Sequence, residues 1–392
     1  MAKSYSELNL SIRTLMGPGP SSVHPRVLRA MTTPLVGYLD PDFFKVMDEV
    51  KELLRYVLQT ANELTIPVSG TGSAGMETCI SNLVETGDEV LVCVNGYFGE
   101  RMCEIIERYG GKVKRINTPW GKVTESSQID EALRSSRAKV VALVHAETST
   151  GARQPLEEIG KIAHKNGALL LVDAVTSLGG HPVKADEWGI DACYSGSQKC
   201  LSCPPGISPV SFSKRAVEAV DSRKTKIGNW YLDMSLVAKY WSDEHTYHHT
   251  PPTSMIYALR EALRLVQEEG LEARFKRHEL NHRALVAGLD AMGIKMFVEE
   301  GSRLWSLNAA CVPEGVDDAR VRGRLLNEFN IEIGGGFGAL KGKVWRIGLM
   351  GYSSSKNNVL MFLGALENVL TSEGYSLKPG AGVGAANSTY NE

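Results

Sequence analysis

The stretch Leu169-Leu170-Leu171-Val172-Asp173-Ala174-Val175 ends a continuous apolar run with a carboxylate. Continuous rather than alternating apolar runs are typical of strands covered on both faces, as in a mostly parallel sheet between helices. The carboxyl ends of such strands border the ligand crevice, and a charge placed there needs a partner. We therefore expect Asp173 to hold a cationic group of a ligand; the alternative is a helix N-cap or a surface aspartate.

Comparable patterns extend in both directions from this stretch. Short apolar or β-branched runs predict strands at 64–69, 91–94, 112–116, 140–144, 169–172, 191–194 and 210–212, and helical spacing predicts helices at 43–58 and 156–165. From about residue 253 the pattern becomes long and helical, and strands at 304–309 and 344–347 precede a last helix at 359–370. The sequence therefore predicts an α/β fold, with a large domain built on a mostly parallel sheet between helices and a smaller C-terminal α+β domain.

The chain divides into four expected parts. We assign residues 1–14 to an N-terminal arm, 15–270 to the large domain, 271–378 to the small domain and 379–392 to a flexible tail. Because the tail begins with a run rich in glycine and alanine, we expect it to lie loose or to drape over the surface.

Composition narrows the class of protein. The 392 residues carry a formal net charge of −2, so the chain does not have the excess of basic residues that is typical of a nucleic-acid-binding protein. Seven scattered cysteines, no apolar signal segment near Met1 and no apolar stretch longer than residues 168–175 lead us to expect a cytoplasmic protein without a membrane partner. Cys200 and Cys203 form a C-x-x-C pair, but no second pair or suitably spaced histidines follow, so we expect no metal site.

The turn Gly70-Thr71-Gly72-Ser73-Ala74-Gly75 matches the dinucleotide-binding pattern G-x-G-x-x-G. A nicotinamide cofactor would also need an acidic residue at the end of the next strand, where the sequence has Asn95 instead. Glycines that let backbone N–H groups approach an anion, a helix N-terminus, and the hydroxyls of Thr71 and Ser73 still favour a phosphate-bearing ligand. A turn without any ligand is the alternative.

Lys199 closes the segment Tyr194-Ser195-Gly196-Ser197-Gln198-Lys199 and lies among small and apolar residues. Desolvation lowers the pKa of a lysine, and a neutral amine can form a Schiff base. Pyridoxal 5′-phosphate (PLP) needs such a lysine, a partner for its pyridinium nitrogen and a phosphate cradle. The turn at residues 70–75, Asp173 and Lys199 offer one candidate for each requirement, in that order along the chain.

Arg346 lies in the strand-like run 343–348, directly after the glycine-rich stretch 334–342. A guanidinium in such a place can bind a substrate carboxylate through two parallel hydrogen bonds. A surface ion pair is the alternative for this residue.

Taken in order, these segments resemble the class V aminotransferases, in the branch of the alanine–glyoxylate and serine–glyoxylate enzymes. The resemblance covers most of the chain and rests on residues 16–21, 69–73, 95–101, 147–151, 172–180, 195–199, 247–250 and 346–348. It implies a PLP enzyme of fold-type I that forms a homodimer, with active sites shared between the two subunits.

The resemblance also implies a role for each site residue. Lys199 would carry PLP as a Schiff base and move the substrate proton, and Asp173 would pair with the pyridinium nitrogen. PLP would make further contacts with Thr71, Gly72, Ser73 and Gln198 at its phosphate, and with Phe98 and Val175 on the two faces of its ring. Thr148 would lie beside its phenolic oxygen, and Tyr247 and Thr250 would reach its phosphate from the neighbouring subunit. The substrate would contact Arg346, the backbone of Gly17, Thr148 and Tyr38. Phe98 and Tyr38 depart from the family pattern, because relatives often have Trp and His there.

The implied reaction moves an amino group from a small amino acid, alanine or serine, to glyoxylate by a ping-pong mechanism. Its products are pyruvate or hydroxypyruvate, and glycine. A single candidate clamp, Arg346, favours a monocarboxylate donor over a dicarboxylate. Serine–pyruvate, ureidoglycine–glyoxylate and hydroxykynurenine transaminases remain open. An NAD-dependent oxidoreductase and a non-catalytic protein with the PLP fold are the alternatives from other classes.

Overall fold

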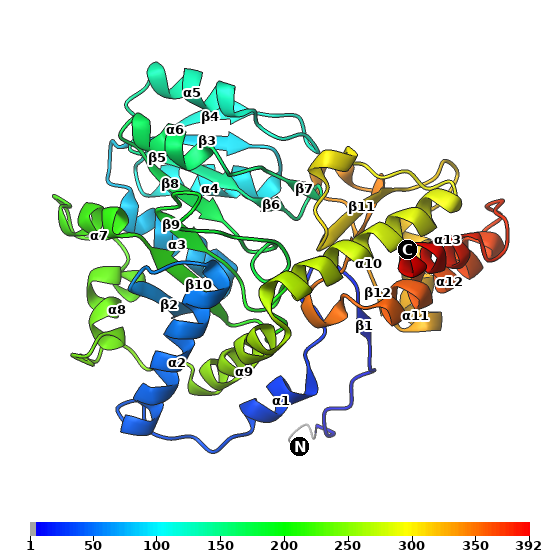
Figure 1. Cartoon of the computed structure of the whole chain (residues 1–392), viewed down its shortest axis with the longest axis horizontal. Coiled ribbons are helices and arrows are strands. Elements are labelled where there is room, and N and C mark those ends of the chain that lie inside the picture. The colour runs from blue at the N-terminus through cyan, green and yellow to red at the C-terminus, as the bar shows by residue number, and fades with distance from the viewer. Residues whose placement is uncertain (1–4) are drawn as a thin grey trace.

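A seven-stranded sheet forms the centre of the large domain in the computed structural model, which describes residues 5–392 (Figure 1). In spatial order its strands are β2 (Leu64–Ser69), β10 (Ile207–Phe212), β9 (Ala192–Tyr194), β8 (Leu169–Asp173), β5 (Val140–Val144), β3 (Glu89–Val94) and β4 (Lys112–Asn117). β10 runs antiparallel to both of its neighbours, and every other pair is parallel. The predicted mostly parallel sheet is thereby confirmed, and strands β2 and β5 have the bounds expected from their apolar runs.

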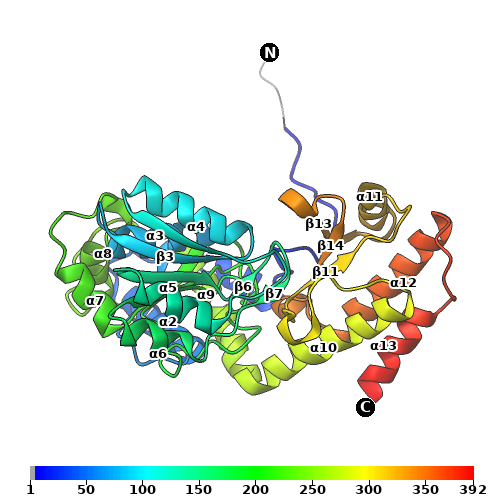
Figure 2. The ribbon, with the colours of Figure 1, turned by 90° about the horizontal axis from the view of Figure 1, so that it is seen from above.

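Helices cover both faces of this sheet, as the continuous apolar strands required. Figure 2 shows α3 (Gly72–Leu83) and α4 (Tyr97–Arg108) on one face, and α2 (Pro41–Leu58) and α6 (Ile159–Lys165) on the other. The remaining helices of this domain are α1 (Pro25–Met31), α5 (Ser126–Arg134), α7 (Lys214–Asp221), α8 (Met234–Trp241) and α9 (Thr253–Glu269). β5 and β8 are buried along their whole length, because neighbouring strands and both helical layers exclude water from them. None of the helices within residues 5–392 is long and apolar enough to cross a membrane.

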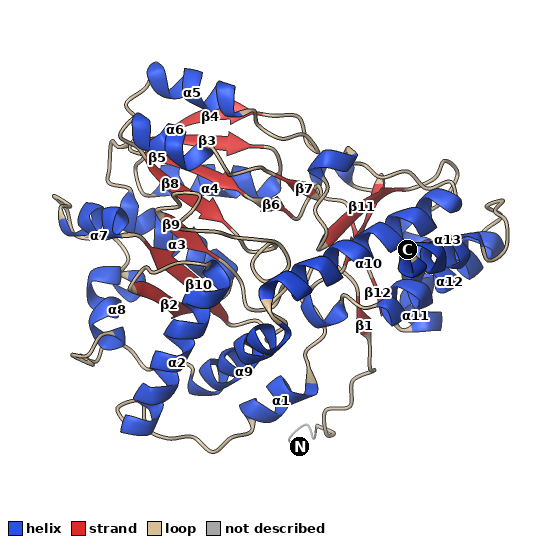
Figure 3. Ribbon diagram, viewed as in Figure 1, coloured by secondary structure: helices blue, strands red, loops and turns tan. Residues whose placement is uncertain are grey.

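The small domain has its own sheet and core (Figure 3). Antiparallel strands β11 (Leu307–Cys311), β14 (Val344–Gly348) and β13 (Gly334–Gly335) form the sheet, with β14 in the centre. Its helices are α10 (Leu271–Ala291), α11 (Asp318–Phe329), α12 (Lys356–Ser372) and α13 (Ala381–Asn391). Short elements complete the chain: β6 (Ala146–Glu147), β7 (Ala152–Arg153), and one-turn helices at Trp230–Leu232, Glu300–Ser302, Gly338–Leu340 and Gly351–Ser353. The strand expected at 304–309 is observed at Leu307–Cys311, because its pairing with β14 begins at Leu307 opposite Gly348.

Of the two arrangements expected for the tail, the structure shows the one in which it lies on the surface, and it is helical there. Residues Ala381–Asn391 form helix α13, which packs against α10 and α12 instead of lying loose. Glu367 accepts hydrogen bonds from the backbone N–H groups of Gly380 (3.0 Å) and Gly382 (2.6 Å), which caps the start of the helix. Ala386 is fully buried, and the Tyr390 hydroxyl donates to Asn281 Oδ1 at 2.7 Å. The small residues of the tail allow close helix packing.

The boundary expected between the arm and the large domain also shifts. β1 (Thr14–Leu15) pairs with β12 (Ile331–Glu332), and Met16 is buried in the core of the small domain. The chain therefore enters the small domain first and then crosses to the large one. Residues 1–4 of the expected arm lie outside the described residues, and Figure 2 shows the next part of the arm extending away from the body.

Candidate active site

A cavity of about 130 Å³ lies at the carboxyl ends of the central strands. It is lined by Thr71, Gly72, Ser73, Met76, Phe98, Arg101, Asp173, Val175, Tyr194, Gln198 and Lys199. Most of the cofactor contacts expected from the sequence thus meet around one cavity, although they are spread over more than a hundred residues of chain. This is the place where ligands bind in open sheets of this type.

Asp173 is the last residue of β8 and lies beside Tyr194, the last residue of β9. Its carboxylate accepts hydrogen bonds from the Tyr194 hydroxyl at 2.7 Å and from the Val175 backbone N–H at 2.8 Å. Burial raises the pKa of Asp173 to about 7, despite these two hydrogen bonds. A positively charged ligand group beside this buried carboxyl would stabilise its ionised form. Tyr194 was missed by the sequence reasoning, although it precedes Ser195 in the lysine segment.

Lys199 follows β9 in a short loop, and its amine donates a hydrogen bond to the Pro18 carbonyl. The Lys199 side chain is partly buried and lines the cavity. Burial, together with the positive charge of Arg346, lowers the pKa of Lys199 to about 8. Gly19 passes close by with a φ of +107°, and a Cβ there would lie 2.5 Å from Lys199 Nζ. The backbone at this point therefore requires glycine.

The turn at residues 70–75 becomes the N-terminus of α3, with Thr71 as the N-cap. The Thr71 side chain makes no capping hydrogen bond, so its hydroxyl is available to a ligand. The Ser73 hydroxyl accepts a hydrogen bond from the Arg101 guanidinium at 3.0 Å. Gln198 Oε1 is buried with no hydrogen-bond partner in residues 5–392. Helix-terminal N–H groups, two hydroxyls, a nearby guanidinium and an unsatisfied amide together form a cradle suited to an anion.

Arg346 occupies the middle of β14 in the small domain. Its Nε donates to the Gly335 carbonyl at 2.7 Å and its Nη1 to the Thr148 carbonyl at 3.3 Å, so it joins the two domains. The Phe337 ring lies over the guanidinium at 4.0 Å. Burial lowers the pKa of Arg346 to about 10, which still leaves it charged at neutral pH.

Glu147 is a buried carboxylate that the sequence reasoning did not single out. It accepts hydrogen bonds from the Phe98 backbone N–H at 3.1 Å and from the Ser149 N–H and hydroxyl at 3.0 and 2.6 Å. These contacts hold Phe98 at the cavity. Burial nevertheless raises the pKa of Glu147. Its only sequence signal was its position directly before Thr148, whose hydroxyl lies 2.5 Å from that of Thr176.

Three of the expected contacts lie outside the cavity: Tyr38, Tyr247 and Thr250. The rings of Tyr38 and Tyr247 are 5.0 Å apart, and the Tyr247 hydroxyl is 3.3 Å from Thr250 Oγ1. None of the three lines the cavity formed by residues 5–392 of the same chain. Gly17 lies beside β14, where the Gly348 N–H donates to the Met16 carbonyl at 2.6 Å.

Comparison with known proteins identifies the family. The family model described as Aminotransferase class-V matches residues 25–357. The chain belongs to the class V aminotransferases. The resemblance inferred from the sequence motifs is therefore confirmed.

Three relatives place this aminotransferase within its family. The (S)-ureidoglycine–glyoxylate transaminase of Bacillus subtilis is 42% identical over 98% of this chain and 97% of its own length. A solved structure of ureidoglycine–glyoxylate aminotransferase from Bacillus subtilis has a TM-score of 0.97 and 44% identity, and the match covers 99% of this chain and 100% of that one. Alanine–glyoxylate aminotransferase of Rattus norvegicus is 42% identical over 93% of this chain and 89% of its own. The solved alanine–glyoxylate aminotransferase of Nostoc sp. has a TM-score of 0.93 at 53% identity, over 94% and 98%. The predicted fold-type I is confirmed by these structures.

The class V family implies PLP as the cofactor, and the residues of this aminotransferase fit it. The lowered pKa of Lys199, about 8, makes its neutral amine more accessible near neutral pH than that of an ordinary lysine, which suits an aldehyde, and the buried carboxylate of Asp173 suits a protonated ring nitrogen. The unsatisfied Gln198 amide at the α3 terminus suits a phosphate; turned by 180°, it would present its NH₂ donor there.

Proposed function

We propose that this aminotransferase transfers the amino group of alanine or serine to glyoxylate, which yields pyruvate or hydroxypyruvate and glycine. The observation that carries the proposal is Arg346, a charged guanidinium buried close enough to Lys199 to lower the pKa of its amine. Arg346 is not among the residues that line the cavity, whereas Arg101 lines it and donates to the Ser73 hydroxyl. Arg346 already donates from Nε and Nη1 to two carbonyls, and its remaining N–H donors would suit one small monocarboxylate.

The large-domain residues would act on the cofactor and on the substrate proton. Bound through Lys199, PLP supplies an electron sink that makes the Cα proton of an amino acid acidic. Lys199, once released by the incoming amine, would take that proton and return it to the cofactor side. Asp173 would keep the ring nitrogen protonated, and Tyr194 would hold the Asp173 carboxylate in place.

The remaining contacts would orient the two ligands. Thr71, Gly72, Ser73 and Gln198 would bind the phosphate, and Phe98 and Val175 would hold the ring between them. Arg346 and the Gly17 backbone would bind the substrate carboxylate, with Thr148 beside it. We propose that a second subunit supplies Tyr38, Tyr247 and Thr250, because they lie away from the cavity of their own chain.

A second candidate is ureidoglycine–glyoxylate transamination. It is favoured by the Bacillus subtilis relative, which is 42% identical over nearly the whole chain. Both candidates use glyoxylate as the acceptor and differ only in the donor. The distinction therefore depends on the side chain that the site accepts.

Two measurements test the proposal. Borohydride reduction of the protein followed by mass mapping should place a pyridoxyl group on Lys199, and Lys199→Ala should lose both the label and turnover. A panel of alanine, serine and ureidoglycine against glyoxylate and pyruvate, followed by loss of the cofactor absorbance, should rank alanine or serine first. Wild-type turnover by Lys199→Ala would refute the assignment, and a clear preference for ureidoglycine would select the second candidate.

A further inference from the structure

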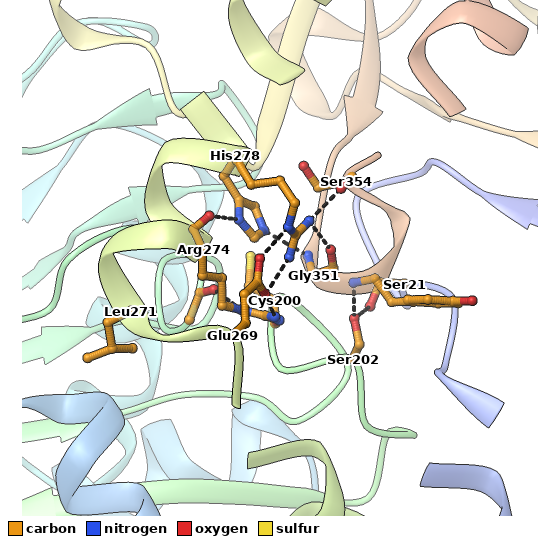
Figure 4. A network of polar contacts seen from close by, with 12 residues as sticks. Ser21, Cys200, Ser202, Glu269, Leu271, Arg274, His278, Gly351 and Ser354 are labelled. Carbon is orange, nitrogen blue, oxygen red and sulfur yellow. Dashed lines mark hydrogen bonds and ion pairs between the residues drawn. The ribbon is translucent and has the colours of Figure 1, made fainter. Parts of the chain in front are cut away.

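Two arginines and one glutamate surround the joint between the domains. Gly270 separates α9 from α10, with Glu269 just before it and Arg274 and Arg277 in the first turns of α10. The Glu269 carboxylate accepts from Arg274 Nη1 at 2.6 Å (Figure 4). It also accepts from Arg277 Nε and Nη2 at 2.5 and 2.9 Å. We call these three residues the joint cluster.

Arg274 attaches the joint cluster to the large domain. Its side chain is buried, and it donates to the Gly179 carbonyl at 2.7 Å and to the Cys200 carbonyl at 2.6 Å. Cys200 directly follows Lys199. The guanidinium thus binds the peptide group that joins Cys200 to Leu201, one residue beyond the lysine, and buried hydrogen bonds from a charged donor hold such a group firmly.

Arg277 attaches the joint cluster to the small domain. It donates to the Gly351 carbonyl at 3.0 Å and also to the Ser354 carbonyl. Gly351 follows β14, the strand that carries Arg346, by three residues. One carboxylate therefore links the backbone after Lys199 to the backbone after β14.

The two backbone segments also meet directly, as Figure 4 shows. Gly351 has a φ of +54°, and a Cβ there would lie 2.5 Å from the Cys200 carbonyl oxygen. His278 Nδ1 lies 2.7 Å from the Arg274 carbonyl, and its Nε2 accepts from the Gly351 N–H at 3.0 Å. Ser202 Oγ accepts from the Tyr352 N–H at 2.8 Å. Hydrogen bonds and close backbone packing therefore join the two segments at this contact.

We propose that Glu269, Arg274 and Arg277 are positioning residues that set the separation between Lys199 and Arg346. The inference rests on the proposed function, in which Lys199 handles the Cα proton while Arg346 binds the carboxylate of the same substrate. These two groups belong to different domains, so the joint determines whether one small molecule reaches both. A displacement of about 1 Å between reacting groups costs about 100-fold in rate.

The joint cluster carries the charge that this role requires. Burial by itself raises the pKa of Glu269, but hydrogen bonds and charges from Arg277 and Arg274 outweigh it and keep the pKa below its ordinary value. Glu269 is therefore ionised at neutral pH. Removing its charge leaves the buried Arg274 cation without its counter-charge.

Glu269→Gln is the decisive variant, and Glu373→Gln is its matched control. Glu373 also binds two arginines, Arg320 and Arg324 at 2.9 Å each, but α11 carries both of them inside the small domain. Both variants should lose thermal stability. At a temperature where each is folded, Glu269→Gln should lower kcat/KM for the amino donor about 10- to 100-fold, while Glu373→Gln should stay within about twofold of wild type.

A second readout does not depend on the donor. In the resting holoenzyme, hydrogen exchange at the Gly351 and Tyr352 amides should quicken at least about tenfold in Glu269→Gln and stay unchanged in Glu373→Gln. If Glu269→Gln fails to fold, Arg277→Met takes its place, because it removes only the half-exposed attachment to the small domain. Equal kcat/KM and equal exchange in Glu269→Gln and Glu373→Gln would overturn the proposal. If wild type turned over none of the donors, the proposed function would fail, whereas the exchange experiment would still decide whether the joint cluster holds the two segments together.

Discussion

The two sides of the active site are built in different ways. On the large-domain side, Asp173 ends β8 and Lys199 follows the neighbouring strand β9, and burial shifts the pKa of each toward neutrality. On the small-domain side, Arg346 lies in mid-strand, keeps its charge, and is bound by two carbonyls and one aromatic ring. The groups proposed to react, Asp173 and Lys199, are thus tuned by exclusion of water, whereas Arg346, proposed to bind the substrate carboxylate, is oriented by hydrogen bonds. Each variant below changes one side, and any effect on the other side measures how strongly the two are coupled.

Asp173→Asn should have the largest effect. A neutral amide cannot keep the ring nitrogen protonated, so we expect kcat to fall about 100- to 10,000-fold with little change in KM. Steady-state kinetics with alanine and glyoxylate measure this. Tyr194→Phe removes only one hydrogen bond to the Asp173 carboxylate and should cost no more than about tenfold. A large rise in KM without a fall in kcat would show that Asp173 acts on substrate binding.

Arg346→Gln should have the next largest effect, on KM rather than on kcat. Losing hydrogen bonds from a charged donor to the substrate carboxylate should raise KM about 10- to 100-fold. Donor titrations under saturating glyoxylate measure the change. A variant with normal KM and reduced kcat would contradict a role in carboxylate binding.

The rate at which the apoenzyme binds PLP covalently should depend on pH, and this effect should be smaller than those of the two substitutions above. Only the neutral amine of Lys199 can attack the PLP aldehyde, and its pKa of about 8 is below the ordinary value for lysine. The rate of covalent attachment should therefore rise about tenfold between pH 7 and pH 9 and then level off. Stopped-flow absorbance measures the rate.

Arg346→Gln provides the matched test of this profile. The positive charge of Arg346 contributes to lowering the pKa of Lys199, so its removal should move the midpoint to higher pH. A wild-type midpoint near pH 10 would mean that the amine is not desolvated.

Phe337→Ala should have the smallest effect. The Phe337 ring lies 4.0 Å from the Arg346 guanidinium carbon and is 39% exposed. Loss of a cation–π contact at such a site should raise KM about two- to fivefold. Phe337→Leu keeps apolar bulk without an aromatic face and should match the alanine variant if the ring's charge distribution matters. Restoration of wild-type KM by leucine would assign the effect to bulk alone.

Much of the scaffold could be predicted from the sequence. The apolar runs at 64–69 and 140–144 correspond to strands with those bounds, and the order of glycine turn, aspartate and lysine predicted the residues around the cavity. Such signals are local, because a strand or a helix terminus depends mainly on residues close along the chain. The tail shows where local reasoning fails. Its glycines and alanines suggested a loose segment, but Glu367 and Met292 provide the surface on which α13 packs.

The elements, and the chemical groups at the ends of the central strands, follow from the local sequence. Only the tertiary structure decided which groups meet: Tyr194 on Asp173, Arg101 on Ser73, and Glu269 between Arg274 and Arg277. Those partners depend on strand order and on how two domains dock, which no short stretch of sequence encodes. The shifted pKa values of Lys199 and Asp173 have the same origin, because water is excluded only when distant segments close around them.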